Sequence, residues 1–322
     1  MTSSEELSSV MENNTDFFRL LDLRADDLTY YSPYSFLRET DSARLCRETF
    51  TGPLIQDIGK GKASVTILDI EGRRTWFVWR ELAWDSEYFR RRVVRIDLIL
   101  PDHDSAEITG RAITRFAEKT AGNDGYISVN IPSEDLFLIR SMAHSEFRLV
   151  ETRLNYYFDS FDSVTAPSEP VRQALPDDIP ALRDVAMNMR NCFDRVHADP
   201  AFTDEVADAY LDTFIEQSVK GFADIVTVPD LPGVKPFAFL AADDPAEIMG
   251  HRIAKLVLAA ADNSEHKGWL SKLLSAVIFE LKQRGTDILT TITQASNRPA
   301  IRTWEWAGFR LGFVTHLWSY SR

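Results

Sequence analysis

The chain of 322 residues is long enough for two domains of ordinary size, and its 44% hydrophobic and 26% charged residues are typical of a globular protein without a membrane span. Its formal charge of −13, from 36 basic and 49 acidic residues, disfavours nucleic acid as a partner. Cys46 and Cys192 are its two cysteines, so neither a disulfide framework nor a metal site is expected, and the first residues lack a secretory signal, which predicts a cytoplasmic protein.

Apolar spacing in the first half predicts a run of helices and strands. Residues 108–120 have helical spacing, residues 126–131 read as a strand, and Pro132 with Ser133 favours the start of a further helix. Residues 152–157 read as another strand. We therefore expect helix, strand, helix and strand in this order.

A connector follows this first half. Residues 159–170 are rich in serine, proline and acidic residues and have few large apolar side chains, which is typical of an exposed linker. We therefore predict a first domain at 1–160, a linker at 161–170 and a second domain at 171–322.

The second half opens with two predicted strands, at 236–242 and 251–261. Asp244 and Pro245 lie between them and favour a turn. Residues 262–264 offer side chains that can cap the N-terminus of the next helix. The second strand is therefore expected to lead directly into a helix.

A second run of four elements completes the chain. Leucine, valine and isoleucine recur at helical spacing over 271–284, and residues 287–293 predict a strand. Residues 297–299 favour the start of a helix, and residues 315–320 read as the last strand. This order repeats the order predicted for the first half.

Short sequence matches accompany the repeated order of elements. Phe-Arg-Leu occurs at 147–149 and at 309–311, and Thr-x-Leu-x-x-Tyr occurs at 152–157 and at 315–320. Two copies of one α/β module account for both observations. The alternative is a chance recurrence, since strand, helix and strand follow one another in any α/β protein.

The start of the helix at Gly268 is a candidate anion site. A helix that leaves a strand end presents backbone N–H groups and the positive end of its dipole, and both favour a phosphate. Gly268 permits close approach to the backbone. An ordinary amphipathic helix with Trp269 on its flank is the alternative explanation.

These residues resemble the Gcn5-related N-acetyltransferases, or GNAT superfamily. That family binds acetyl-CoA with an Arg/Gln-x-x-Gly-x-Gly/Ala loop followed by two leucines; residues 268–274 are similar to it, with Glu265 at the basic position and Leu270 at the second small position. The family continues after a strand with Asn-x-x-Ala, a tyrosine and Gly-Phe. The residues in this pattern are Asn297, Ala300, Trp304, Gly308 and Phe309.

Three further segments resemble bacterial dTDP-fucosamine acetyltransferases, which acetylate the amine of a nucleotide-linked amino sugar. They are residues 82–89, 126–154 and 199–224, and the likeness extends over about residues 80 to 322. The resemblance implies transfer of an acetyl or related acyl group to the amine of an amino sugar, in particular a nucleotide-linked one.

The resemblance implies an α/β (α+β) fold of tandem GNAT-like modules, each a mixed central sheet flanked by helices, the N-terminal one degenerate. It implies acetyl-CoA or another acyl-CoA as co-substrate of the second module, without a metal. The residues that it assigns to acyl-CoA binding are Leu256, Val257, Leu258, His266, Lys267, Gly268, Trp269, Leu270, Ser271, Asn297 and Ala300.

Trp304 stands where the family has a tyrosine that protonates the departing thiolate. An indole N–H donates a hydrogen bond but does not ionise near neutral pH, so Trp304 cannot serve as a general acid. His251, His316 and Tyr320 are alternative proton donors, together with water. His316 and Tyr320 have the alternative of being ordinary rim residues of the last strand.

On the acceptor side, Arg195, His197 and Asp199 lie in a polar stretch before Pro200, where the related enzymes begin to shape the sugar-nucleotide site. An arginine facing that site would suit a substrate diphosphate. A solvated loop is the alternative for each of the three residues.

Two other functions remain open. Glu265, Leu270 and Trp304 favour a catalytically impaired GNAT-fold protein with a binding or regulatory role. The acidic surface also suits an N-acetyltransferase acting on a peptide or other small amine. A homodimer is expected as an alternative to a monomer, and the acceptor and the acyl chain length stay open.

Overall fold

The computed structural model describes residues 15–38, 40–262 and 267–321. The chain divides into two compact units, of which the first combines Met1–Val150 with Phe313–Arg322 and the second is Glu151–Gly312. Two strands, β5 (Arg148–Phe158) and β11 (Arg310–Ser321), carry the chain from one unit into the other. Each unit is described separately below.

The first unit is a mixed sheet with helices. After helical residues 15–23, its elements are α2 (Ala25–Leu28), η1 (Thr29–Tyr31), α3 (Ser42–Cys46), η2 (Arg47–Thr51), α4 (Gly52–Gly59), β1 (Ser64–Ile70), β2 (Arg73–Glu81), α5 (Ala83–Phe89), β3 (Val93–Pro101), α6 (Ala106–Ala121), β4 (Tyr126–Pro132) and α7 (Leu136–Met142). β1, β2 and β3 pair antiparallel, β3 pairs with β4 in parallel, and β4 pairs antiparallel with residues 315–321 of β11. The helix α6 covers the sheet, and its Phe116 ring stacks on Phe77 at 4.4 Å.

The second unit has the same plan. Its elements are η3 (Phe161–Ser163), β6 (Val171–Gln173), η4 (Pro176–Asp178), α8 (Ile179–Asn188), α9 (Asp204–Gln217), η5 (Ser218–Phe222), β7 (Ile225–Pro229), β8 (Ala238–Ile248), β9 (His251–Ala261), α10 (Trp269–Gln283), β10 (Ile288–Gln294) and α11 (Arg298–Trp306). β6 to β9 pair antiparallel in chain order, β9 pairs with β10 in parallel, and β10 pairs antiparallel with residues 153–158 of β5.

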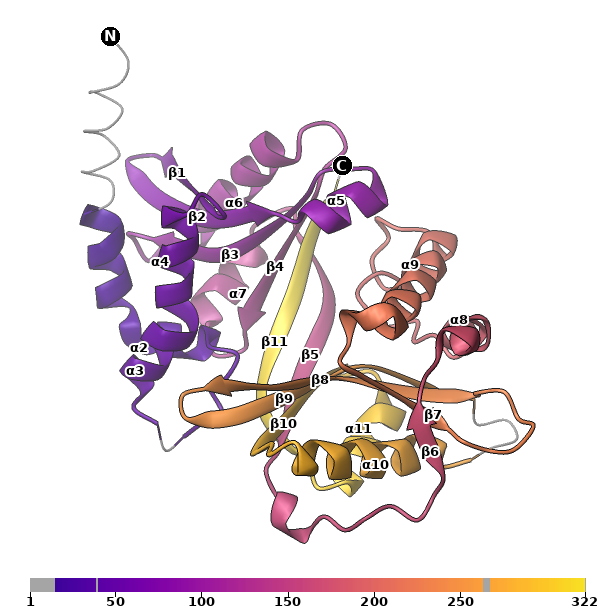
Figure 1. Ribbon diagram of the computed structural model, residues 1–322. Coiled ribbons are helices and arrows are strands. Elements are labelled where there is room, and N and C mark those ends of the chain that lie inside the picture. Colours follow the sequence, from indigo (N-terminus) through magenta and orange to yellow (C-terminus); the bar gives the residue numbers. More distant parts are fainter. Residues whose placement is uncertain (1–14, 39, 263–266, 322) are drawn as a thin grey trace. The chain divides into compact units, whose positions relative to one another are not determined.

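Helices cover both faces of this second sheet. Leu240 of β8 packs with α10, whereas the next residue, Ala241, packs with α8 and α9, because successive strand residues point to opposite faces. Figure 1 shows α10 on one side of β8 and β9 and α8 and α9 on the other. The sheet therefore reads as continuously apolar where it is buried on both faces.

The two units confirm the predicted α/β modules. Each has three antiparallel strands in chain order, a crossover helix leading to a parallel strand, and an antiparallel strand beyond it. In each, the third strand of this series carries a bulged residue, Asp97 in β3 and Val257 in β9. So many shared features are not expected from a chance recurrence of strand and helix.

The compact units differ from the predicted domains, 1–160 and 171–322, at their last strands. Residues 153–158, which the sequence places at the end of the first half, pair with β10 in the second unit. Residues 315–321, at the end of the second half, pair with β4 in the first unit. Local patterns identify strands but not the strands with which they pair, so sequence reading does not detect this exchange.

Three predicted boundaries were wrong. Asp244 and Pro245 do not form the turn before β9, because β8 continues through them and the chain reverses at Met249 and Gly250, whose positive φ values of 54° and 81° suit a tight hairpin. The helix expected at Pro132 begins at Leu136, where Asp135 caps it. The helix α10 begins at Trp269 with Gly268 as its N-cap, so the candidate cap at residue 262 is not used, while residues 263 and 264 lie outside the described residues.

Among the described residues, no helix is both long enough and apolar enough to cross a membrane.

A partly buried ion pair joins β6 to η4, just before α8. The Asp178 carboxylate accepts hydrogen bonds from Arg172 at 2.6 and 2.9 Å and from the Leu175 backbone N–H at 2.8 Å. The hydrogen bonds from Arg172 hold the pKa of Asp178 below its usual value of 3.8. The ionised carboxylate is therefore more stable in the folded state than in the unfolded chain.

Asp178→Asn is expected to lower the free energy of unfolding by about 1–3 kcal/mol near neutral pH. Because the folded-state pKa is lowered, this contribution is complete above the unfolded-state pKa and disappears as the pH falls through the folded-state pKa. Urea unfolding of both proteins near pH 7 and near pH 2 measures the difference. The control is Asp177→Asn at an exposed neighbouring position; an equal loss for Asp178→Asn at both pH values would contradict the assignment.

Candidate functional site

A cavity of about 610 Å³ lies in the second unit where β9 and β10 separate. The two strands pair in parallel only over Ile253–Lys255 and Ile288–Thr290. Beyond these residues both strands continue, and residues 256–261 of β9 and 291–294 of β10 line the cavity. The strand edges that would otherwise bond to each other therefore leave room for a ligand.

A β-bulge shapes the β9 wall of this cavity. Leu256 pairs with Ala242 of β8 and Leu258 pairs with Ala241, so Val257 is an extra residue in β9. A bulge bends its strand and redirects the backbone groups next to it. Leu256, Val257 and Leu258 all line the cavity, so the structure brings these three predicted residues together.

The N-terminus of α10 lies beside the cavity. Leu270, in its first turn, lines the cavity and is half-buried, while Trp269 is buried and meets Phe237 edge to face at 5.5 Å. The N-cap, Gly268, has a φ of 80°, and no side chain of the described residues caps the helix. First-turn N–H groups without a side-chain cap are suited to an anionic ligand.

The first unit differs at the corresponding helix start. Ser105 caps α6, and its Oγ accepts a hydrogen bond from the backbone N–H of Ile108 at 3.4 Å. A side chain thus occupies the place that an anion would take. This difference agrees with the expectation that the N-terminal module is degenerate.

The remaining predicted loop residues have different positions. Lys267 and Ser271 are exposed. Neither is among the residues that line the cavity. His266 and Glu265 lie outside the described residues.

The helix α11 supplies another wall of the cavity. Asn297 caps this helix, with its Oδ1 accepting the backbone N–H of Ala300 at 3.3 Å, and both residues line the cavity as predicted. Trp304, one turn further on, also lines the cavity, is 5% exposed and lies 5.7 Å from the Phe309 ring. The Trp304 Nε1–H is buried and has no hydrogen-bond partner among the described residues.

The predicted proton donors are not brought together. His251 is the first residue of β9, whereas the cavity is lined by the last residues of that strand. His316 and Tyr320 belong to the first unit. There, His316 Nε2 lies 3.1 Å from the Ser133 Oγ, burial lowers the pKa of the His316 imidazole, and Tyr320 is buried with its ring 5.6 Å from Phe147.

The predicted acceptor residues Arg195, His197 and Asp199 do not line the cavity. Asp199 is fully buried and accepts the backbone N–H of Ala201 at 3.0 Å, so it shapes the loop. Arg195 donates to the Tyr210 hydroxyl at 3.2 Å. These interactions tie the loop to itself and to α9.

Sequence reasoning missed the residues just before this stretch. Residues 189–194 follow α8 and all line the cavity. Asn191 Nδ2 donates to Gln294 Oε1 at 2.7 Å, which links this segment to β10. The stretch has no periodicity or recognised motif, so only the tertiary structure assigns it to the cavity.

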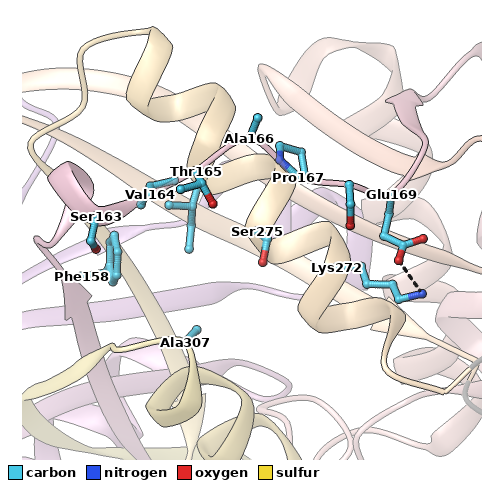
Figure 2. Close-up of a pocket in the computed structure, with 12 residues that line it drawn as sticks. Phe158, Ser163, Val164, Thr165, Ala166, Pro167, Glu169, Lys272, Ser275 and Ala307 are labelled. Carbon is cyan, nitrogen blue, oxygen red and sulfur yellow. Dashed lines mark ion pairs between the residues drawn. The ribbon is translucent and has the colours of Figure 1, made fainter.

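A second cavity, of about 450 Å³, lies between the linker and α10. Figure 2 shows residues 163–169 passing along α10, with Lys272 directed at Glu169. These two side chains form an ion pair at 3.1 Å and are the charged residues among those lining the cavity. The separating strands β9 and β10 contribute nothing to this cavity, so the first cavity is the stronger candidate site.

Among the described residues, no group of three or more histidine, cysteine, aspartate or glutamate side chains is arranged to hold a metal ion.

Comparison with known proteins identifies the fold. No family model matches the chain, and no curated protein matches it. Solved structures do match: a GCN5-related N-acetyltransferase from Sphaerobacter thermophilus has a TM-score of 0.55 and 14% identity, over 85% of this chain and 86% of that one. A functionally unknown conserved protein from Staphylococcus epidermidis has a TM-score of 0.50 and 8% identity, over 82% and 97% of the two chains.

A third match lies within a much larger protein. It is the GCN5-related glucosamine N-acetyltransferase region of a fungal multi-domain GH3 β-N-acetylglucosaminidase, with a TM-score of 0.53 and 11% identity, over 93% of this chain and 37% of that one. At such identities the likeness is one of fold, and none of these three proteins is named as a dTDP-fucosamine enzyme. The chain therefore has the mixed α/β fold of the GCN5-related N-acetyltransferases.

Proposed function

We propose that the protein is an N-acyltransferase that transfers an acetyl or related acyl group from acyl-CoA to an amine. The observation that carries this proposal is the cavity between β9 and β10, which meets the N-terminus of α10, where no side chain of the described residues caps the helix. In this arrangement the helix N–H groups would hold phosphate, and the separated strand edges would hold the amide-containing arm of the coenzyme. The acyl thioester supplies the activated acyl group.

The size of the cavity bears on whether Leu270 obstructs the coenzyme. The volume of about 610 Å³ is present with the Leu270 side chain in place as part of the wall. Ligand-binding cavities are commonly about 300–1,000 Å³. Leu270 therefore narrows the site without filling it, which supports a coenzyme-binding function over a fold that has lost its ligand.

Trp304 is compatible with slow or moderate acyl transfer. The indole cannot give up a proton near neutral pH, but a thiol with a pKa of about 8.5 is already a good leaving group. Losing a general acid typically costs a factor of about 10² to 10⁴ in rate and does not abolish the reaction. The substitution thus lowers the expected rate without excluding the reaction.

For the acceptor, we propose the amine of an amino sugar, nucleotide-linked as in the enzymes that segments 82–89, 126–154 and 199–224 resemble. One observation favours a second candidate, a peptide or small amine without phosphates. Arg190 is the cation among the described residues that line the cavity, and it is already paired with Asp208 at 2.5 Å and Asp204 at 3.5 Å. A diphosphate would have to compete with these carboxylates.

The test measures binding and transfer separately. Calorimetry with acetyl-CoA measures binding, and release of free thiol with panels of amino sugars, amino-sugar nucleotides, small amines and peptides measures transfer. Binding with transfer supports the enzyme and ranks the acceptors. Binding without transfer to any amine supports the alternative of a binding or regulatory protein, and neither binding nor transfer contradicts the proposal.

Leu270→Trp is expected to weaken acetyl-CoA binding at least about tenfold, or about 1.4 kcal/mol, because the larger side chain extends into the cavity. Calorimetric titration of the wild type and the variant measures this change. The control is Leu311→Trp, at an exposed leucine of β11 that does not line the cavity. Equal affinities of all three proteins would place the coenzyme elsewhere.

Trp304→Phe is expected to leave kcat within about threefold, because it keeps an aromatic ring beside Phe309 and removes only a group that cannot ionise. Trp304→Ala is expected to lower the free energy of unfolding by about 3–5 kcal/mol by opening a void. Thiol-release kinetics and urea unfolding measure the two effects. A loss of about 10²-fold or more in Trp304→Phe would show instead that the indole N–H contacts the reacting groups.

A further inference from the structure

Four side chains beside the cavity form a continuous hydrogen-bonded chain. His197 Nδ1 lies 2.7 Å from Asp194 Oδ2, and His197 Nε2 lies 3.1 Å from Asp208 Oδ1. The other oxygen of Asp208 accepts from Arg190 at 2.5 Å. Asp194 and Arg190, the two ends of this chain, both line the cavity, while the His197 side chain is only 2% exposed.

The Asp194 carboxylate is held in a fixed orientation. Its Oδ1 accepts the backbone N–H groups of Val196 at 2.8 Å and His197 at 3.0 Å, while Oδ2 meets the imidazole. The Asp194 side chain is 21% exposed, so it is in reach of both solvent and a ligand in the cavity. A carboxylate fixed in this way loses little orientational freedom when it binds an amine.

The charged side chains around His197 are mostly acidic. Asp194 is on its own segment, and Asp208 and Asp204 come from α9, whereas Arg190 follows α8. Burial raises the pKa of Asp208, but hydrogen bonds from Arg190 and His197 outweigh it and hold that pKa below its usual range. Three carboxylates against one guanidinium give these side chains a net negative charge, which attracts an ammonium ion.

We propose that Asp194 accepts the proton of the acceptor amine and that His197 is the residue that positions the Asp194 carboxylate. The proposal rests on the proposed acyl transfer and deepens it. Among the described residues that line the cavity, Asp194 provides the carboxylate, and none is a histidine, glutamate or lysine. The acceptor class is therefore an amine that arrives as a cation and needs deprotonation before it can react.

The proton and electron balance of the reaction is complete with these groups. The bound R–NH₃⁺ gives one proton to the Asp194 carboxylate, which Nδ1–H of His197 holds in place. The freed lone pair attacks the thioester carbonyl, the C–N bond forms, the C–S bond breaks, and the thiolate leaves with the bonding electrons. A second proton from the nitrogen neutralises the thiolate, and Asp194 returns the first proton to solvent.

The experiment compares Asp194→Asn, Asp194→Glu and His197→Gln with the wild type, using an amine that the wild type acetylates. The measured quantities are kcat/KM across the pH range and the Kd of acetyl-CoA. Asp194→Asn is expected to lower kcat/KM by about 10²–10⁴-fold below the pKa of the amine. Its residual rate should rise about tenfold per pH unit until the amine is itself deprotonated.

The two other variants test the roles separately. His197→Gln should change the pH profile of kcat/KM without changing the Kd of acetyl-CoA. Substitution of a purely structural residue would not change the pH profile. Asp194→Glu should recover part of the lost rate, because it restores a carboxylate. The matched control is Asp184→Asn, at an exposed position of α8 that is not one of the four hydrogen-bonded side chains. Its kcat/KM should stay within about threefold of the wild-type value.

Unchanged urea midpoints and acetyl-CoA affinities show that the variants are folded. If kcat/KM of Asp194→Asn is within about threefold of the wild-type value and has the same pH profile, the inference is overturned while the proposed acyltransferase function stands. A wild type that binds acetyl-CoA but transfers to no amine overturns both. An Asp194→Asn protein that loses affinity for acetyl-CoA in proportion to its rate also overturns the inference, because the residue would then act on coenzyme binding.

Discussion

The parallel contact between β9 and β10 ends after three residues, and the candidate site depends on that separation. If the ladder continued, the strand edges would be occupied by each other and no cavity would form between them. The bulge at Val257 bends β9 in the region where the strands separate. Backbone geometry, more than any single side chain, thus creates the space in which a ligand can lie.

The same topology occurs in the first unit with different chemistry. At its bulge, Asp97 forms ion pairs with Arg80 at 2.6 Å and Arg95 at 2.7 Å, where the second unit has Val257. Its crossover helix is capped by the Ser105 side chain, whereas the N-cap of α10 is Gly268. In the first unit Asp97 and Ser105 therefore have partners within the unit, whereas in the second Val257 lines the cavity.

The charged side chains that line the cavity also have partners within the protein. The chain is acidic overall, yet among the described residues Arg190 and Asp194 are the charged ones that line the cavity, and each is hydrogen-bonded to a partner behind the wall. Such a wall is poorly suited to a second set of phosphates and well suited to an amine. The sugar-nucleotide acceptor therefore rests on sequence resemblance, while the charge distribution favours a simpler acceptor.

The sequence by itself determined the repeated α/β modules, and its resemblance to a known family identified six residues that line the cavity: Leu256, Val257, Leu258, Leu270, Asn297 and Ala300. The modules follow from apolar spacing and helix-capping residues, which are local signals. The tertiary structure decided which strand completes each sheet, and it assigned residues 189–194 to the cavity. It also showed that His197 lies between Asp194 and Asp208 and does not face a substrate. Strand pairing and side-chain contacts between α9 and the preceding loop join residues distant in sequence, and no local pattern encodes such contacts.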